Sequence, residues 1–145
     1  MKLPSETLVY PSTPIYPGSN FTWGEATEDC KRSLENLYID GRLIITAAQI
    51  EQNIISVARN LDAYREKLDN RPIIINSWYR PRAVNRNNGG VKWSRHQYGD
   101  GVDWVSGYFS PQDAARILEP DHNDGGYKAY SNFTHTDWRG HKARW

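Results

Sequence analysis

The chain has 145 residues, a length that suits one domain with its own core, and its one cysteine, Cys30, excludes an internal disulfide and a zinc site made of cysteines alone. Eighteen Lys and Arg against seventeen Asp and Glu give a net charge of +1, which argues against a mainly electrostatic nucleic-acid binder, so we expect no specific nucleic-acid partner. The mean hydropathy of −0.78 and the lack of a long apolar run exclude a transmembrane helix.

The first twenty residues differ in composition from the rest, because they hold four of the eight prolines. This predicts an extended N-terminal arm or linker over 1–20, followed by a single domain over 21–145. The opening residues contain one Lys but no continuous apolar run, so we expect no secretory signal peptide.

A strong helical pattern covers 46–68. Thr46 and Gln49 form a capping-box pattern at its start, and Asp69 to Pro72 should end it. Apolar residues recur at steps of three and four and predict one buried stripe: Ile50, Ile54, Val57, Ala58, Leu61, Tyr64 and Leu68.

The second half of the chain predicts short strands and one more helix. A buried strand is expected at 72–77, a long loop at 77–93, a strand at 102–105, a helix capped by Ser110 that runs to about Leu118, and one or two strands within 127–138. The predicted fold class is therefore α+β, with helices packed on a small antiparallel sheet.

His96 and Asp103 form the first candidate pair. Asp103 lies between Val102 and Trp104 on a predicted strand, where a carboxylate needs a partner or a cation. Gly99 and Gly101 permit a tight bend that would bring His96 back beside Asp103. A simple buried ion pair is the alternative interpretation.

His135 and Asp137 form the second candidate pair, because residues two apart on a strand share one face. Two imidazoles and two carboxylates are the ligand chemistry of a catalytic zinc site. Zinc lowers the pKa of a bound water to about 7, and a spare carboxylate can act as general base.

Three segments, Ser77–Asn85, Gly89–Asp103 and Phe133–Arg139, resemble the zinc D-Ala-D-Ala carboxypeptidase family. The family pattern is S-x-x-R, then S-x-H-x-x-G-x-A-x-D, then a late H-x-D or H-x-H. The chain matches it in order and spacing, with Gly101 where the family usually has Ala. The resemblance covers roughly 20–145 and implies peptidoglycan peptidases of the Hedgehog/DD-peptidase fold.

Carried over, the resemblance implies a zinc ion held by His96, Asp103 and His135. Whether His135 or Asp137 is the third ligand stays open, and imidazole, the commoner zinc ligand, favours His135. Asp137 is implied as the general base or as a partner behind a ligand. Other branches place the base three residues before the last histidine, where this chain has Asn132, which cannot take a proton from water.

Three further residues are implied on the substrate side. Arg80 corresponds to the family arginine that holds a substrate carboxylate or a developing oxyanion. Asn85 and Ser94 would flank the groove and bind substrate, or would only order their loop. No role is assigned to His122, which is expected in a polar turn, and the basic segment after His135 is expected to be solvated or attracted to anionic wall polymers.

The resemblance therefore implies a zinc peptidase acting on peptidoglycan stem peptides, as a D-Ala-D-Ala carboxypeptidase, a cross-link endopeptidase or an L-alanyl-D-glutamate endopeptidase. The alternative is a non-catalytic zinc-containing module of the same fold that binds the wall or a protein partner. We expect a monomer that acts outside the cytoplasm, as an endolysin-like phage protein or as a domain of a longer exported protein.

Overall fold

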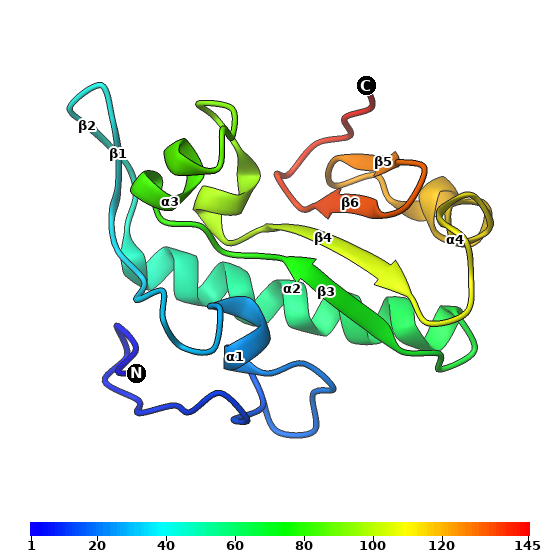
Figure 1. The fold of residues 1–145 in the computed structure, drawn as a ribbon, viewed down its shortest axis with the longest axis horizontal. Helices are drawn as coiled ribbons and strands as arrows, with labels where there is room; N and C mark the ends of the chain where they lie inside the picture. Colours follow the sequence, from blue (N-terminus) through cyan, green and yellow to red (C-terminus); the bar gives the residue numbers. More distant parts are fainter.

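A four-stranded antiparallel sheet carries the second half of the chain in the computed structural model, which describes all residues 1–145 (Figure 1). The strand order is β3-β4-β6-β5. The strands are β3 Ile73–Ser77, β4 Gly101–Ser106, β5 Tyr127–Ala129 and β6 Thr134–Asp137. This sheet and the helices on it confirm the predicted α+β class.

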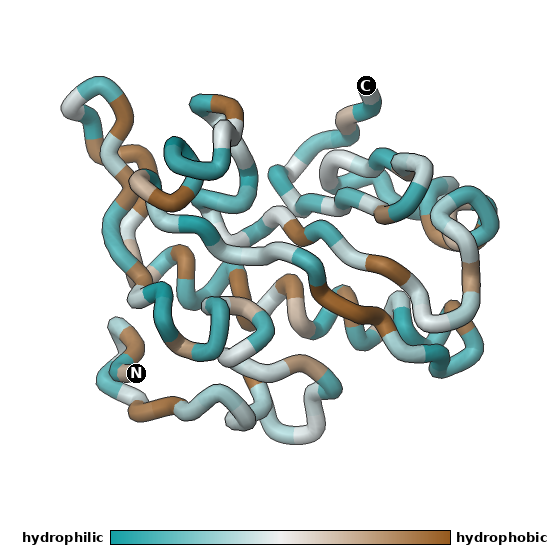
Figure 2. The backbone as a smooth tube through the Cα atoms, viewed as in Figure 1, coloured by the Kyte–Doolittle hydropathy of each residue, from teal (hydrophilic) through white to brown (hydrophobic).

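The long helix α2, Ala47–Lys67, lies along one face of this sheet (Figure 1). Thr46 and Gln49 form the predicted capping box, with the Thr46 Oγ1 accepting from the Gln49 N–H at 3.2 Å. The predicted apolar stripe is buried throughout, and hydrophobic segments recur along α2 and concentrate on β3 (Figure 2). Burying this stripe against Val102 and Trp104 of β4 removes apolar surface from water and fixes the sheet on the helix.

The helix α4, Pro111–Leu118, is also as predicted, with the Ser110 hydroxyl accepting from the Asp113 N–H at its start. The short helix η2, Glu119–Asp121, follows it directly. Three elements of the first half were not predicted: α1 Trp23–Ala26 and the hairpin of β1 Leu37–Ile39 with β2 Arg42–Ile45.

The prediction of a structureless loop over 77–93 is wrong. This segment contains α3, Arg82–Asn87, which starts after Pro81 without a side-chain cap, and is followed by the 3-10 helix η1, Arg95–Tyr98. The completely buried Asn85 anchors α3, because its Nδ2 donates to the Val91 carbonyl at 2.9 Å and so closes the Asn-Asn-Gly-Gly turn.

The strand β3 is shorter and less buried than predicted. Ile73 is buried, but the Ile74 side chain is half exposed, because β3 is an edge strand that α2 covers on one face only. A bulge between Ile75 and Ser77 sets Ser77 opposite Asp103 on β4. Bulges of this kind re-aim side chains next to functional sites.

The N-terminal segment 1–20 lies against the domain. Leu3, Val9 and Ile15 are buried in the main core, and the Ser5 N–H donates to Glu51 of α2 at 2.9 Å. No helix combines the length and the apolar character that a membrane crossing would require.

Candidate metal centre

The register of β4 and β6 brings the two predicted pairs together. Asp103 pairs directly with His135 across the two antiparallel strands, so their side chains lie on the same face. The neighbouring residues point to the other face, where the Trp104 Nε1 donates to the Thr136 Oγ1 at 3.1 Å within the core. The apolar neighbours therefore fix which side chains face outward.

His96 reaches the same face from η1. The Ser94 hydroxyl accepts from the His96 N–H at 3.3 Å, and Gly99 ends the turn with a φ of 74°, a conformation that suits glycine. The His96 Nδ1 lies 2.8 Å from the Trp78 carbonyl, to which it must donate because a carbonyl only accepts. The His96 Nε2 is left 3.2 Å from the Asp103 Oδ2.

His135 is fixed in the same way by Asp137. Its Nε2 lies 2.9 Å from the Asp137 Oδ2, and its Nδ1 lies 2.8 Å from the Asp103 Oδ1. Asp137 is completely buried, and its carboxylate accepts from the Gly126 N–H and from the Nε and Nη2 of Arg139 at 2.9, 2.8 and 2.6 Å.

These contacts set the charge of the cluster in the metal-free protein. Burial favours the neutral form of Asp103, but hydrogen bonds from His135 and His96 outweigh it and hold the pKa of Asp103 well below its usual range. For His135, burial likewise opposes the charge, yet its bonds to Asp103 and Asp137 raise its pKa to about 9. Asp137 stays ionised, since Arg139 and His135 overcome burial and lower its pKa far below the usual value.

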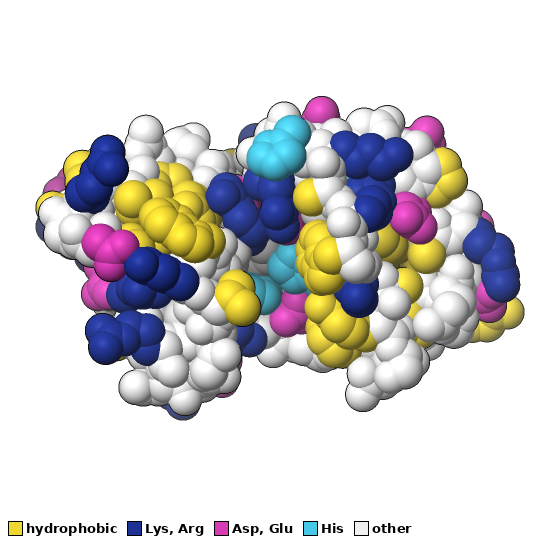
Figure 3. Space-filling model, turned by 90° about the horizontal axis from the view of Figure 1, so that it is seen from above, with side chains coloured by type: hydrophobic (Ala, Val, Ile, Leu, Met, Phe, Trp, Pro, Cys, Tyr) yellow, Lys and Arg dark blue, Asp and Glu magenta, His cyan; other side chains and the backbone are white.

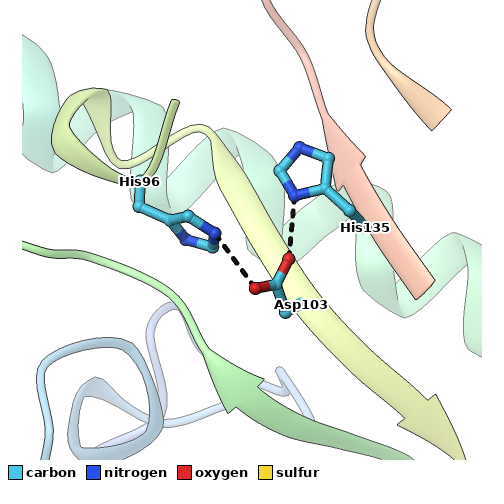
Figure 4. Close-up of side chains that lie close together, drawn as sticks. All are labelled: His96, Asp103 and His135. Carbon is cyan, nitrogen blue, oxygen red and sulfur yellow. Dashed lines mark hydrogen bonds and ion pairs between the residues drawn. The ribbon is translucent and has the colours of Figure 1, made fainter. Parts of the chain in front are cut away.

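The donor set fits a zinc ion. One ligand atom each of His96, Asp103 and His135 lies within 4.8 Å of the others, and Figure 4 shows both imidazoles directed at the one carboxylate. Each imidazole has one nitrogen bound to a protein acceptor and the other directed into the cluster. This arrangement is typical of histidines that ligate zinc, where the second bond fixes the tautomer and the ring orientation.

The cluster lies in a groove of about 570 Å³. One wall comes from the segment that includes Val91, Trp93 and Arg95, and the other from the β5–β6 turn and the C-terminal segment, with Tyr130, Phe133, Arg139, Arg144 and Trp145. The Trp145 ring meets the His135 ring edge to face at 5.5 Å. Figure 3, a view onto this face, shows the hollow with histidine atoms visible inside it.

Arg80 lies beside the cluster. Its backbone N–H donates to the His96 carbonyl at 3.1 Å, and its Nε donates to the Ser77 hydroxyl at 3.0 Å. Burial lowers its pKa, and the neighbouring Asp103 carboxylate counteracts that shift. The two Nη atoms of Arg80 have no hydrogen-bond partner in the chain, although Arg80 is not among the residues that line the groove.

Ser94 and Asn85 lie differently from each other. Ser94 lines the groove and also caps the turn that holds His96. Asn85 lies outside the groove and is completely buried, so this geometry favours the alternative in which it orders its loop over a substrate contact. The Asn85 Oδ1 packs against Gly90, where an added Cβ would lie 2.1 Å away, and this close approach requires glycine.

The geometry of Asp137 favours one of its two implied roles. Both of its oxygens already accept two hydrogen bonds each, and it does not line the groove. It therefore suits a partner that orients His135 and not a general base. Asn132 is exposed in the turn between β5 and β6.

Sequence reasoning missed three contributors to the site. Arg139 continues the alternation of His135 and Asp137, and that spacing could have revealed it. The Trp78 carbonyl carries no side-chain signal. His122, expected in a polar turn, is instead 2% exposed, and its Nε2 donates to the Asp137 carbonyl at 2.8 Å.

An α+β fold with a His-Asp-His cluster that lines a groove defines a candidate metal centre. A sequence model of the peptidase M15 family matches residues 22–137, so the chain belongs to this family. Membership of the family implies the DD-peptidase-like fold. Over 100 aligned residues the chain is 31% identical to the zinc D-Ala-D-Ala carboxypeptidase of Streptomyces albus G. The alignment covers 63% of this chain and 37% of that protein, so the chain spans well under half of its relative.

Proposed function

We propose that this chain is a zinc-dependent peptidase that hydrolyses a peptide bond in bacterial peptidoglycan stem peptides. The observation that carries the proposal is the convergence of His96, Asp103 and His135 in a groove of a peptidase M15 family member. The name of the Streptomyces relative supports both zinc and a D-Ala-D-Ala peptide.

Each residue of the site has a role in this proposal. A zinc ion held by His96, Asp103 and His135 would supply a Lewis acid and a water of lowered pKa. Arg80 donates its free Nη groups to a substrate carbonyl or carboxylate. Asp137 accepts the Nε2–H of His135 and thereby keeps the Nδ1 of His135 available as a ligand atom.

The finer features of the proposal rest on the same family. The scissile bond is that of a D-Ala-D-Ala carboxypeptidase or of a related endopeptidase. We propose action outside the cytoplasm on the cell wall, by a monomer whose segment 21–145 is the catalytic domain and whose segment 1–20 is an arm of it.

A non-catalytic zinc-containing module that binds the wall or a protein partner is the second candidate. It is favoured by one observation, since Asp103 is the only carboxylate that lines the groove and both histidines contact it. With Asn132 in the turn and Asp137 fully hydrogen-bonded, the groove offers no free carboxylate as proton acceptor.

Elemental analysis of three purified proteins tests the proposal first. We expect about one zinc per chain in the wild type and in His141→Ala, a control at an exposed histidine, and none in His96→Ala. Each protein is then incubated with a stem pentapeptide ending in D-Ala-D-Ala, and the products are identified by mass spectrometry. Zinc without cleavage of any stem peptide bond favours the binding module, and absence of zinc in the wild type rejects both.

A further inference from the structure

The tryptophans of this chain divide between the core and one surface. Four of the six lie in the main core or pack against it. Only Trp93 and Trp145 are well exposed, at 53% each, and both line the groove of the candidate metal centre. An exposed indole leaves a large apolar surface in water, and such side chains gathered in a groove typically mark a binding site.

The two exposed indoles lie on opposite walls of the groove. Trp93 belongs to the segment before η1, and Trp145 belongs to the C-terminal segment. Tyr130 and Phe133 extend the second wall, and their rings are stacked nearly parallel with centroids 4.5 Å apart. Figure 3 shows hydrophobic side chains on both sides of the hollow. The groove therefore offers flat apolar surfaces on both walls.

The chain holds the indole of Trp145 in place. Its ring meets the His135 ring at 5.5 Å, and the Arg139 guanidinium carbon lies 5.5 Å from the indole centroid. The Lys128 Nζ donates to the Trp145 backbone oxygen at 3.0 Å. A ring that is already fixed loses little conformational entropy when a ligand stacks on it.

The charged side chains that line the groove are compensated within the protein. Each of its three arginines has an acidic partner: Arg95 with Asp100, Arg139 with Asp137 and Arg144 with Glu119. The one acidic residue of the lining, Asp103, lies between His96 and His135. A lining of aromatic faces and paired charges suits a neutral ligand that has flat apolar faces of its own.

The substrate of the proposed function contains one component of this kind. Stem peptides consist of small and charged residues and include no aromatic ring. The glycan strand that carries them is a chain of N-acetylated pyranose rings, which are uncharged where they are joined to the peptide. One face of a pyranose ring is formed by C–H groups that pack on an indole, and its rim of hydroxyl and amide groups stays in water.

We propose that Trp93 and Trp145 form a saccharide subsite, in which pyranose rings next to the stem peptide stack on the two walls of the groove. This inference rests on the proposed function and narrows it. The preferred substrate is a stem peptide that is still attached to its glycan, and the free peptide is the poorer ligand.

Two ligands that differ only in the sugars test the proposal. One is a stem pentapeptide joined to the disaccharide of N-acetylglucosamine and N-acetylmuramic acid. The other is the same pentapeptide with an acetylated N-terminus, so that neither ligand carries an ammonium group there. Their affinity for the wild-type protein is measured by isothermal titration calorimetry in EDTA, which prevents zinc-dependent cleavage, and their hydrolysis by the zinc-loaded protein is followed separately. We expect the disaccharide form to bind on the order of tenfold more tightly, because an aromatic contact contributes a factor of about 2 to 10.

Variants of the exposed aromatic residues then locate the effect. Trp93→Ala and Trp145→Ala should each reduce the advantage of the disaccharide form by about 2- to 10-fold. Trp145→Phe keeps an aromatic face beside His135 and should retain part of the advantage that Trp145→Ala loses. Tyr10→Ala removes a similarly exposed ring from the N-terminal segment, outside the groove, and is the matched control that should leave the advantage unchanged.

The outcomes separate this inference from the proposed function. Equal affinity for the two ligands, including no binding of either, overturns the inference, whether or not the zinc-loaded protein cuts them. An advantage that persists undiminished in Trp93→Ala or in Trp145→Ala, or that Tyr10→Ala also removes, overturns the assignment of the subsite to these indoles. An advantage that both tryptophan variants reduce supports it. If the zinc-loaded protein then cuts neither ligand, only the peptidase proposal fails.

Discussion

The guanidinium of Arg139 donates hydrogen bonds to a buried carboxylate. Its Nε and Nη2 donate to the two oxygens of Asp137, and the Asp137 Oδ2 also contacts the Nε2 of His135. A bidentate pair of this kind fixes the plane of the carboxylate as well as its charge. Arg139 is therefore a positioning residue for His135, acting through Asp137.

Replacing Arg139 by Gln should weaken zinc binding by about 10- to 100-fold, because partners behind a metal ligand typically contribute that much. Zinc affinity is measured by competition with a chromogenic chelator, and the absorption spectrum of the cobalt-substituted protein reports ligand geometry. Arg139→Lys keeps the charge but loses the bidentate contact, so its affinity should be intermediate. Wild-type affinity and an unchanged cobalt spectrum in Arg139→Gln would show that Asp137 holds His135 without help.

At this scale the sequence predicted which residues meet, but not how they are bonded. Period two on a strand was enough to place His135 and Asp137 on one face, and the glycine bend placed His96 beside Asp103. That the two pairs meet was implied by the resemblance alone. That the Gly126 N–H binds Asp137, and that the Trp78 carbonyl fixes His96, depend on backbone positions distant in sequence. The burial of Asn85 was equally hidden, because a polar residue among Asn and Gly is typical of an open turn.

At the scale of elements, η1 positions His96, and Gly99 ends η1 against α2. Gly99 has a φ of 74°, and a Cβ added there would lie 3.0 Å from side-chain carbons of both Ile50 and Ile54. Gly41, in the β1–β2 turn, has a similar φ of 76° but open space around it. The two glycines therefore share backbone strain and differ in crowding.

Gly99→Ala should cost about 2–5 kcal/mol of unfolding free energy, from about 1–2 for the left-handed backbone and about 1–3 for overpacking. Gly41→Ala should cost only the backbone part, about 1–2 kcal/mol. Urea unfolding of both variants in EDTA gives the comparison without any metal contribution. An equal loss of unfolding free energy in the two variants would mean that Ile50 and Ile54 move aside at no cost. The close contact of Gly99 with α2 would then not hold η1 in place.

The elements that could be predicted are those with a strong local signal. For α2 the apolar stripe and the capping box agree, and for α4 a Ser cap is followed by Pro. By contrast, α3 has six residues and no side-chain cap, so its formation depends on the burial of Asn85. The hairpin of β1 and β2 is short, and Tyr38 and Leu43 are about half exposed, which leaves little periodicity to detect.

At the scale of the whole molecule, His122 links the helix α2 to the strand β6, which carries His135 and Asp137. Its Nε2 donates to the Asp137 carbonyl at 2.8 Å, so its Nδ1 must accept from the Tyr64 hydroxyl of α2, 2.5 Å away. Burial raises the pKa of Tyr64 to about 12, which keeps this hydroxyl a donor. The Arg144 Nη2 also donates to the His122 carbonyl at 2.7 Å and ties down the C-terminal segment.

This linkage predicts how the metal-free fold responds to acid. Burial, reinforced by the nearby Arg144, lowers the pKa of His122 below its usual 6.5, so the unfolded chain takes up this proton more readily than the folded one. The stability that neutral His122 provides is complete above about pH 6.5 and is lost as the pH falls below it. His122→Gln keeps a donor and an acceptor in one side chain but cannot titrate.

Urea unfolding in EDTA at about pH 8 and about pH 5.5 measures the effect, since both proteins share every other titrating group. We expect the wild type to be the more stable at the higher pH and its advantage over His122→Gln to shrink at the lower pH. A constant difference between the two proteins would mean that His122 keeps an ordinary pKa in the fold. Acid would then lower the unfolding free energy through other groups. The hydrogen bonds from α2 through His122 to β6 would not account for the loss of stability at low pH.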